Sequence, residues 1–370
     1  MVSHWQYWNP VQIIFGTNAL GELKHKIAGR PYCLVTYPDE SFSSHVEQIA
    51  VSAGEPTCLI RNVEPNPNYT SLSAACGEFG RSQPRPQVIV ALGGGSAIDT
   101  AKVLAAAGDD FSRVRNHIEG REPFDLLAHP IIAVPTTSGT GSEVTCWATV
   151  WDTASKKKYS LARKELYPEC AVVDPRLTIG LSRNLTVSTG LDALSHALES
   201  IWNINANPVS TRHAIFAARE VIACLPELVD NLSNIGLRAR MANASLSAGL
   251  AFSNTKTALA HSLSYHLTLH HGVPHGIACS FSLPSVMRSV AGVSSDCDDA
   301  LRLVFGPDLS RGALDLARVI QTLGVSLDPL SYGVTRDEWL GNVEYAFAGE
   351  RGRNFIGDQR MMMNEATVAA

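Results

Sequence analysis

The sequence predicts an α/β N-terminal domain with a doubly wound, mostly parallel sheet, followed by an all-α C-terminal domain. Up to about residue 178, short apolar runs typical of strands alternate with segments of helical period, as in βαβ units. From residue 182 onward nearly every segment has helical period, and no strand-like alternation returns. A chain of 370 residues, 45% of them hydrophobic, can bury a core in each of two domains. We therefore expect domains at 1–178 and 179–370.

Each strand expected in the first domain is a short apolar run that ends at turn residues. The strand at 32–36 is followed by Tyr37-Pro38-Asp39, and the strand at 87–92 is followed by three glycines. The expected strands span 9–16, 32–36, 56–61, 87–92, 130–134 and 171–173, with a hairpin over 147–161. The helices between them span 19–27, 40–53, 70–81 and 97–107. In the second domain the expected helices span 184–201, 208–231, 236–252, 256–270, 276–291, 310–323 and 336–348.

Composition and charge exclude several classes of protein. A net charge of −5, with no basic run longer than Lys156-Lys157-Lys158, predicts no nucleic-acid partner. No apolar run reaches the roughly 18 residues that a membrane helix needs, and the N-terminus lacks a secretory pattern. Eight scattered cysteines without a C-x-x-C pair favour reduced thiols. We expect a cytoplasmic protein with no membrane or nucleic-acid partner.

Four side chains in the second domain have the types and spacing of a metal site. Asp192 and His196 are four positions apart, so on a helix they project from one face. His261 lies in a later segment of helical period, and His275 follows a proline that must turn the chain. One carboxylate and three imidazoles suit Fe²⁺ or Zn²⁺. The competing interpretation is that each is an ordinary buried polar residue, as a single histidine on an apolar helix usually is.

Two loops in the first domain have the composition of a phosphate-binding site. Gly93-Gly94-Gly95-Ser96 lies between an expected strand and an expected helix, where glycines let a backbone approach phosphate and the helix start offers N–H groups. It matches neither G-x-G-x-x-G nor a Walker loop. The loop 135–142 carries five hydroxyls after another strand, at the sheet edge where α/β proteins bind ligands. A plain tight turn and a polar helix cap are the alternative interpretations.

Taken together, the segments LGGGSAIDTAK, PTTSGTGSEVT, GLDALSHALES and the PHG ending at 274–276 resemble the iron-containing (group III) alcohol dehydrogenase family. The resemblance implies that 1–178 binds NADH or NADPH, that 179–370 binds Fe²⁺ or Zn²⁺, and that an aldehyde and a primary alcohol are interconverted between the two domains. It implies that the metal polarises the carbonyl, while the nicotinamide supplies hydride. It implies Asp192, His196, His261 and His275 as metal ligands. The implied cofactor contacts are Gly94, Gly95, Ser96, Asp99, Thr136, Thr137, Thr140 and Lys158.

The sequence departs from the family at two informative positions. Tyr37 stands where NAD-preferring members usually carry an aspartate that would repel a 2′-phosphate, so NADPH is admissible, although Asp39 is near enough to replace that aspartate. Tyr265 stands where members commonly carry a second histidine, and His266 is displaced by one position. Tyr265 is therefore either a donor to the substrate or an ordinary core tyrosine.

Short segments resemble a subgroup of the family, the phosphonoacetaldehyde reductases: W-x-Y-x-NPV-x-I-x-FG at the start and K-T-x-x-A-H-S-x-S-Y around His261. This implies phosphonoacetaldehyde as substrate and 2-hydroxyethylphosphonate as product. We expect Lys256 to hold the anionic group, with Lys158 and Arg353 as further candidates, and Trp147 and Phe252 to line the substrate pocket.

Other functions stay open from the sequence. One is a general short-chain alcohol or aldehyde dehydrogenase. Another is a lyase like dehydroquinate synthase, which shares the two-domain plan; the few Lys and Arg residues near the metal motifs disfavour it. A non-catalytic metal or nucleotide sensor is a third. The expected partners are a small aldehyde and a second copy of the chain in a homodimer.

Overall fold

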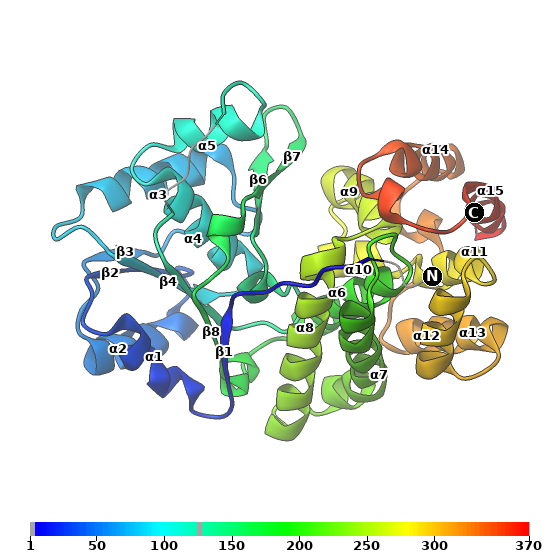
Figure 1. The fold of residues 1–370 in the computed structure, drawn as a ribbon, viewed down its shortest axis with the longest axis horizontal. Helices are drawn as coiled ribbons and strands as arrows, with labels where there is room; N and C mark the ends of the chain where they lie inside the picture. Colours follow the sequence, from blue (N-terminus) through cyan, green and yellow to red (C-terminus); the bar gives the residue numbers. More distant parts are fainter. Residues whose placement is uncertain (1–3, 124–127, 370) are drawn as a thin grey trace. The chain divides into compact units, whose positions relative to one another are not determined.

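The computed structural model describes residues 4–123 and 128–369. It divides into two compact units. The α/β unit comprises Pro10–Thr137 and Ser142–Thr178, and the helical unit comprises the described residues up to Asn9 together with Ser138–Gly141 and the chain from Ile179 onward (Figure 1). A parallel sheet domain followed by a helical domain confirms the predicted fold class.

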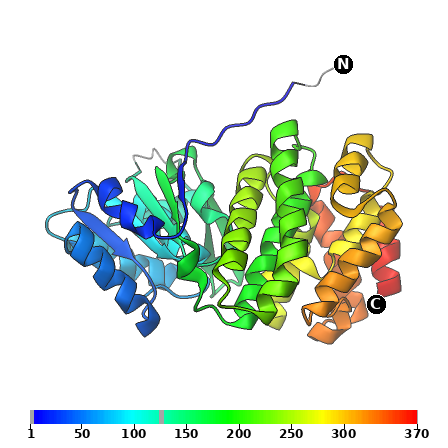
Figure 2. The same ribbon diagram turned by 90° about the horizontal axis from the view of Figure 1, so that it is seen from below.

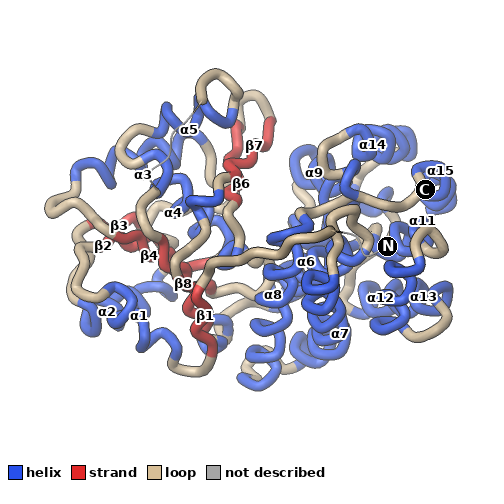
Figure 3. The backbone as a smooth tube through the Cα atoms, viewed as in Figure 1, coloured by secondary structure: helices blue, strands red, loops and turns tan. Residues whose placement is uncertain are grey.

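The α/β unit is built on a six-stranded parallel sheet in the order β1-β8-β5-β4-β2-β3 (Figure 3). The chain runs outward from β2 to β3 on one side and from β4 to β5 and β8 on the other, while β1 lies at the far edge beside β8. The carboxyl ends of β2 and β4 therefore form the switch point at which such sheets bind ligands. The predicted hairpin is confirmed as a separate antiparallel pair, β6–β7. The strands are β1 Gln12–Phe15, β2 Tyr32–Val35, β3 Cys58–Ile60, β4 Val88–Gly93, β5 Ile131–Pro135, β6 Trp147–Asp152, β7 Lys157–Ala162 and β8 Cys170–Val173.

Helices cover both faces of this sheet because its strands are apolar on both sides. In β2, Cys33 and Val35 pack in one core with residues of α3, α4 and α5, whereas Tyr32 and Leu34 pack in the other with residues of α1 and α2. This alternation follows from the two-residue period of a strand. The helices are α1 Leu23–Ile27, α2 Ser43–Ala53, α3 Tyr69–Arg81, α4 Gly95–Ala107 and α5 Phe111–Ile118.

The helical unit packs around α6, which is buried at every residue from Gly190 to Ile201. Helices α7 and α8 lie against it and against each other (Figure 2). None of the helices in the described chain has the length and hydropathy needed to cross a membrane. The helices are α6 Arg183–Ile201, α7 Pro208–Asp230, α8 Ile235–Thr255, α9 Leu259–His271, α10 His275–Ser280, α11 Leu283–Val290, α12 Ser295–Phe305, α13 Leu309–Thr322, α14 Arg336–Ala348 and α15 Gln359–Ala369.

The predicted ranges of two helices in the second domain were wrong. The helix expected at 256–270 begins only at Leu259, because Lys256 ends α8 with a φ of 63°, which a helix does not permit. The segment expected as one helix at 276–291 is two helices, α10 and α11, because Pro284 lies in the first turn of α11 and cannot donate a hydrogen bond to a continuing helix. Helices α5, α12 and α15 were not predicted.

Candidate metal and cofactor site

Helix α6 supplies the first metal-binding side chains. Its N-terminus is capped by Ser182, whose side chain accepts a hydrogen bond from the backbone N–H of Leu185. Asp192 and His196 lie one turn apart and both are buried, with His196 Nδ1 3.9 Å from Asp192 Oδ1. Helix α6 therefore places both side chains on one face, as the spacing predicts.

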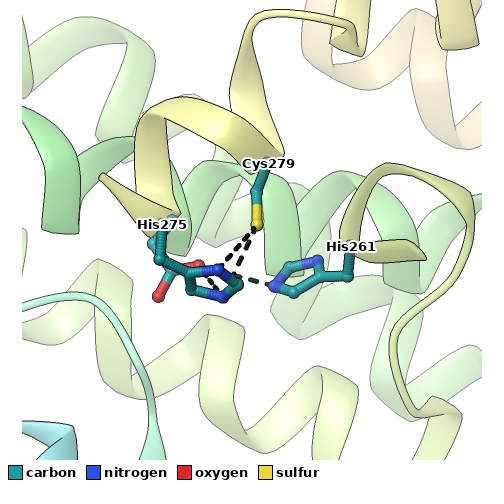
Figure 4. A group of neighbouring side chains, drawn as sticks. His261, His275 and Cys279 are labelled. Atoms are coloured by element: carbon teal, nitrogen blue, oxygen red, sulfur yellow. Dashed lines mark hydrogen bonds and ion pairs between the residues drawn. The ribbon is translucent and has the colours of Figure 1, made fainter. Parts of the chain in front are cut away.

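Helices α9 and α10 bring two more predicted ligands to Asp192. His261 Nε2 lies 3.4 Å from Asp192 Oδ1, and His275 Nε2 lies 3.9 Å from the same oxygen. A residue that we did not predict completes the group, since Cys279 Sγ lies 3.6 Å from His275 Nε2 (Figure 4). One ligand atom from each of the four lies within 4.8 Å of the others.

His196, the fourth predicted ligand, is close to Asp192 but is not one of the four residues whose ligand atoms all lie within 4.8 Å of one another. Its ring stacks on Phe252 with ring centroids 4.0 Å apart, and on His261 at 4.5 Å. Its Nδ1 is 3.3 Å from the carbonyl oxygen of Gly139. His196 Nδ1 is nevertheless as close to Asp192 Oδ1 as His275 Nε2 is, at 3.9 Å, so both Cys279 and His196 lie beside the three other predicted ligands.

The cluster has the properties of a site for a divalent ion. Asp192 Oδ1 and His261 Nε2 are buried, and neither has a hydrogen-bond partner within the described residues. Leaving such atoms unsatisfied costs about 1–3 kcal/mol each, which a bound ion would offset. A tetrahedral ion at ordinary Zn–N, Zn–O and Zn–S lengths holds its ligand atoms about 3.3–3.6 Å apart. Three of the separations in the cluster, at 3.4, 3.6 and 3.9 Å, are close to these values.

The pKa values of Asp192 and His196 suit metal binding. Burial alone would raise the pKa of Asp192, but three neighbouring imidazoles, His196 foremost, hold that pKa well below its ordinary value. Burial lowers the pKa of His196 to about 4, against a partial opposing effect of Asp192. An ionised carboxylate and a neutral imidazole are the forms that coordinate a metal. Burial lowers the pKa of His261, but Cys279, Glu199 and Asp192 together raise that pKa well above its usual value, so this ring would release a proton when it binds an ion.

Glu199, which sequence reasoning missed, fixes the orientation of His261. It is fully buried, and its Oε2 lies 2.6 Å from His261 Nδ1. Its carboxylate also accepts hydrogen bonds from the backbone N–H groups of Ala258 and His261, at 2.9 and 3.1 Å. A carboxylate on Nδ1 leaves Nε2 as the nitrogen directed at a metal. Glu199 lies in the GLDALSHALES segment, seven positions after Asp192, and only that helical spacing pointed to it.

Gly276 explains the close approach of α10 to α6. A Cβ built on Gly276 would lie 1.8 Å from the carbonyl oxygen of Ser188, far inside any permitted contact. Only glycine lets α10 come near enough for His275 to reach Asp192. The glycine of the PHG ending therefore has a packing role beside the ligand.

The predicted phosphate loop lies at the switch point of the α/β unit. Gly94 is the N-cap of α4, and a Cβ on Gly93 would lie 2.6 Å from Ala97 and 2.8 Å from the Tyr37 ring. Tyr37 follows β2 and so lies against this glycine turn, where a dinucleotide's ribose is expected. Burial raises the pKa of Tyr37, partly offset by a hydrogen bond with Ser96. Tyr37, the glycines and Ser96 are thus adjacent, as the cofactor prediction requires.

Both carboxylate oxygens of Asp99 accept hydrogen bonds from other residues of the α/β unit. Its Oδ1 accepts a hydrogen bond from Ser142 Oγ at 2.8 Å, and its Oδ2 accepts one from the backbone N–H of Thr149 at 2.9 Å. Lys102, one turn further along α4 and fully buried, donates to the carbonyl oxygens of Ser142 and Trp147 at 2.7 and 2.8 Å. We had not assigned a role to Lys102, which ties α4 to the segment after the threonine-rich loop.

The remaining predicted cofactor and pocket residues are divided between the two units. Thr136, Thr137, Lys158 and Trp147 belong to the α/β unit, whereas Thr140 and Phe252 belong to the helical unit. Lys158 Nζ lies over the Trp151 ring, 5.3 Å from its centroid.

Tyr265 lies one turn after His261 on α9. Burial raises the pKa of its hydroxyl, against partial opposition from Arg351 and His261. The Arg351 guanidinium lies 5.1 Å from the centre of the Tyr265 ring and donates to Thr257 Oγ1 at 2.9 Å. The sequence does not point to Arg351, because this residue lies in an irregular segment 86 positions after Tyr265.

Lys256 differs from the expectation in both its backbone position and its side-chain partner. It lies in the turn between α8 and α9, so the assumed helical path to His261 was wrong. Its Nζ is 3.4 Å from Glu350 Oε1, and its side chain is more than half exposed. Arg353, the further candidate, donates to the Ala348 carbonyl oxygen at 3.4 Å.

Comparison with known proteins accounts for this combination of cluster, loop and fold. Residues 10–175 match the family described as iron-containing alcohol dehydrogenase, and residues 186–329 match the C-terminal domain of the Fe-containing alcohol dehydrogenase family. The chain belongs to the iron-containing alcohol dehydrogenase family. The predicted resemblance is confirmed, and membership makes the chain one of a family of oxidoreductases.

Three relatives are informative within this iron-containing alcohol dehydrogenase family. The 1,3-propanediol dehydrogenase of Klebsiella pneumoniae is 34% identical over 76% of this chain and 74% of its own. The phosphonoacetaldehyde reductase of Streptomyces viridochromogenes is also 34% identical, over 65% of this chain and 66% of its own. The crystal structure of sulfoacetaldehyde reductase from Bifidobacterium kashiwanohense, in complex with NAD⁺, has a TM-score of 0.92 and 28% identity over 100% of this chain and 99% of that one. The chain spans less than two thirds of the length of some other relatives.

Proposed function

We propose that the protein is a metal-dependent NAD(P)H oxidoreductase that reduces a small aldehyde to a primary alcohol. The observation that carries this proposal is the buried cluster of Asp192, His261, His275 and Cys279, in which Asp192 Oδ1 and His261 Nε2 have no hydrogen-bond partner within the described chain. Such a cluster fits one divalent ion, and the glycine turn beside Tyr37 fits the pyrophosphate of a dinucleotide.

Asp192, His261 and His275 would hold the ion, with Cys279 or His196 as the fourth ligand. When bound, the ion supplies Lewis-acid polarisation of a carbonyl. A thiolate from Cys279 would favour Zn²⁺, whereas an imidazole from His196 suits Fe²⁺ equally well. Tyr265 would hold a proton at its hydroxyl, because burial keeps that group neutral at ordinary pH.

For the cofactor, Gly94, Gly95 and Ser96 would contact the pyrophosphate at the start of α4. Support comes from the sulfoacetaldehyde reductase structure, which holds NAD⁺. Tyr37 carries no negative charge that would repel a 2′-phosphate, so we propose that NADPH is accepted as well as NADH.

We propose a short aldehyde with an anionic group as substrate, with phosphonoacetaldehyde, reduced to 2-hydroxyethylphosphonate, as the first candidate. Two relatives are named for reducing aldehydes of this kind, one with a phosphonate and one with a sulfonate. An anionic group needs a partly desolvated cation near the metal. The relative named for 1,3-propanediol supports the alternative, a short-chain dehydrogenase for uncharged substrates.

Arg351 suits the anion better than Lys256 does. Arg351 is half-buried above Tyr265, whose hydroxyl is influenced by the charges of both Arg351 and His261. A guanidinium has five N–H donors, and the hydrogen bond to Thr257 uses one. Lys256, in contrast, is paired with Glu350 at an exposed position.

The test measures NADPH and NADH oxidation across phosphonoacetaldehyde, sulfoacetaldehyde and propanal. We expect a clear preference for the anionic aldehydes. Replacing Arg351 by Met should lower kcat/KM for these about 10- to 100-fold, because a hydrogen bond to a charged group is worth about 1.5–3 kcal/mol. Propanal should change little, and Arg351→Lys should recover part of the loss.

Lys256→Ala is the matched control, because it removes a nearby cation that pairs with Glu350. A selective loss in Lys256→Ala rather than in Arg351→Met would assign the anion to Lys256. Equal wild-type efficiency on propanal and the anionic aldehydes would refute the anionic substrate but leave the reductase activity. No net oxidation of NAD(P)H with any aldehyde would refute the reductase itself.

A further inference from the structure

A second group of metal-binding side chains lies at the C-terminal end of α9, the helix whose first turn carries His261. His266 and His271 come from α9, and Glu338 comes from the first turn of α14. One ligand atom from each of the three lies within 4.8 Å of the other two. None of the three belongs to the cluster around Asp192.

The two histidines present buried nitrogens that the described chain does not satisfy. His266 Nε2 and His271 Nε2 are both shielded from solvent, and neither has a hydrogen-bond partner within residues 4–123 and 128–369. The two rings lie 5.3 Å apart between centroids. A buried imidazole nitrogen without a partner costs free energy, so two of them on rings this close together favour a ligand that satisfies both.

Glu338 is held in a fixed orientation while retaining coordination capacity. Its Oε2 accepts hydrogen bonds from the backbone N–H and the hydroxyl of Thr335, at 2.8 and 2.9 Å, in the capping box that begins α14. Both of these hydrogen bonds use one oxygen, so Oε1 keeps its lone pairs. The carboxylate is thus positioned beside the imidazoles before any ion binds.

We propose that His266, His271 and Glu338 form a second metal site that binds Zn²⁺. Two imidazole nitrogens and one carboxylate oxygen are a donor set that Zn²⁺ favours, and water can complete the coordination because Glu338 is exposed. The ion would join the last turn of α9 to the first turn of α14. It would thereby fasten the helix that carries His261 without taking part in the reaction.

The test counts zinc bound to the holoenzyme after dialysis against dilute Zn²⁺ and removal of the free ion. We expect two equivalents of metal per wild-type chain, of which His271→Ala and Glu338→Gln each lose one. Glu338→Gln keeps an acceptor for Thr335, so the capping of α14 survives in that variant. His25→Ala, which removes an exposed histidine on α1, should retain two equivalents. Added Zn²⁺ should raise the Tm of the wild type more than that of His271→Ala, in which only the Asp192 cluster can bind the ion.

His275→Ala separates the two sites, because it removes a residue of the Asp192 cluster only. This variant should still bind one equivalent of zinc and still show the Tm increase. A single equivalent in the wild type, or two in both His271→Ala and Glu338→Gln, would overturn the proposal. Neither result bears on the proposed reductase activity, which is measured separately.

Discussion

Replacing Glu199 with Gln tests whether His261 is oriented for a metal by its buried carboxylate. Glu199 accepts three hydrogen bonds, two from backbone N–H groups and one from the His261 ring. A glutamine offers one acceptor oxygen and an amide group that can only donate, so at least one buried N–H would face another donor. That mismatch should lower the free energy of unfolding by about 1–3 kcal/mol.

The effect on the metal follows from the same geometry. Without a carboxylate on Nδ1, the His261 ring is less firmly held and less basic at Nε2. Loss of such a partner typically weakens metal binding about 10- to 100-fold, which corresponds to about 1.4–2.7 kcal/mol. The assay is competition for the metal with a chromophoric chelator, combined with urea unfolding. His261→Ala serves as the reference for nearly complete loss of metal.

Glu220→Gln is the control, because Glu220 undergoes the same chemical change but forms an ion pair with Arg240 near the surface of the helical unit. Its metal affinity should match that of the wild type. An unchanged metal dissociation constant in Glu199→Gln, in a protein that unfolds normally, would refute the orienting role of Glu199.

Two further substitutions test the α/β unit. Lys102→Met should lower the free energy of unfolding by about 1–3 kcal/mol, since the carbonyl oxygens of Ser142 and Trp147 lose a buried donor. Urea unfolding beside the exposed control Lys24→Met checks this, and a loss below about 0.5 kcal/mol, as for an ordinary surface substitution, would contradict it. Tyr37→Asp should shift cofactor preference toward NADH by about 1–2 kcal/mol, because it places a negative charge beside the 2′-phosphate of NADPH. The ratio of kcat/KM values for NADH and NADPH measures this shift. A wild type that uses NADH alone would contradict the prediction.

The sequence was sufficient for those parts of the fold that depend on local periodicity. Strand β4 with its glycine turn, the hairpin β6–β7 and helix α6 each lie close to their predicted ranges, because one run of residues determines each of them. The break at Lys256 was missed because no glycine or proline marks it. Lys256 has a φ of 63° there, and its carbonyl oxygen accepts a hydrogen bond from Asn203, a residue 53 positions away that the local sequence cannot indicate.

The candidate site was predictable where ligand type and helical spacing coincide, as for Asp192 and His196. Cys279 was missed because a cysteine four residues after His275 predicts a metal ligand only if the start of a helix at His275 is known. Arg351 was missed for a different reason, because nothing in the sequence around Thr257 indicates which distant cation packs there.

Helix α6 explains how so few contacts position the metal-binding side chains. Its Glu199 carboxylate meets the backbone at the start of α9, next to His261, and its Ser188 carbonyl meets Gly276 at the start of α10, next to His275. Each later helix is therefore fastened to α6 within one residue of the side chain that it contributes. Because α6 is buried from Gly190 to Ile201, it cannot shift without disturbing the core of the helical unit. The metal geometry is consequently determined by the packing of three helix segments, and residues that never touch the ion, such as Glu199 and Gly276, contribute to it.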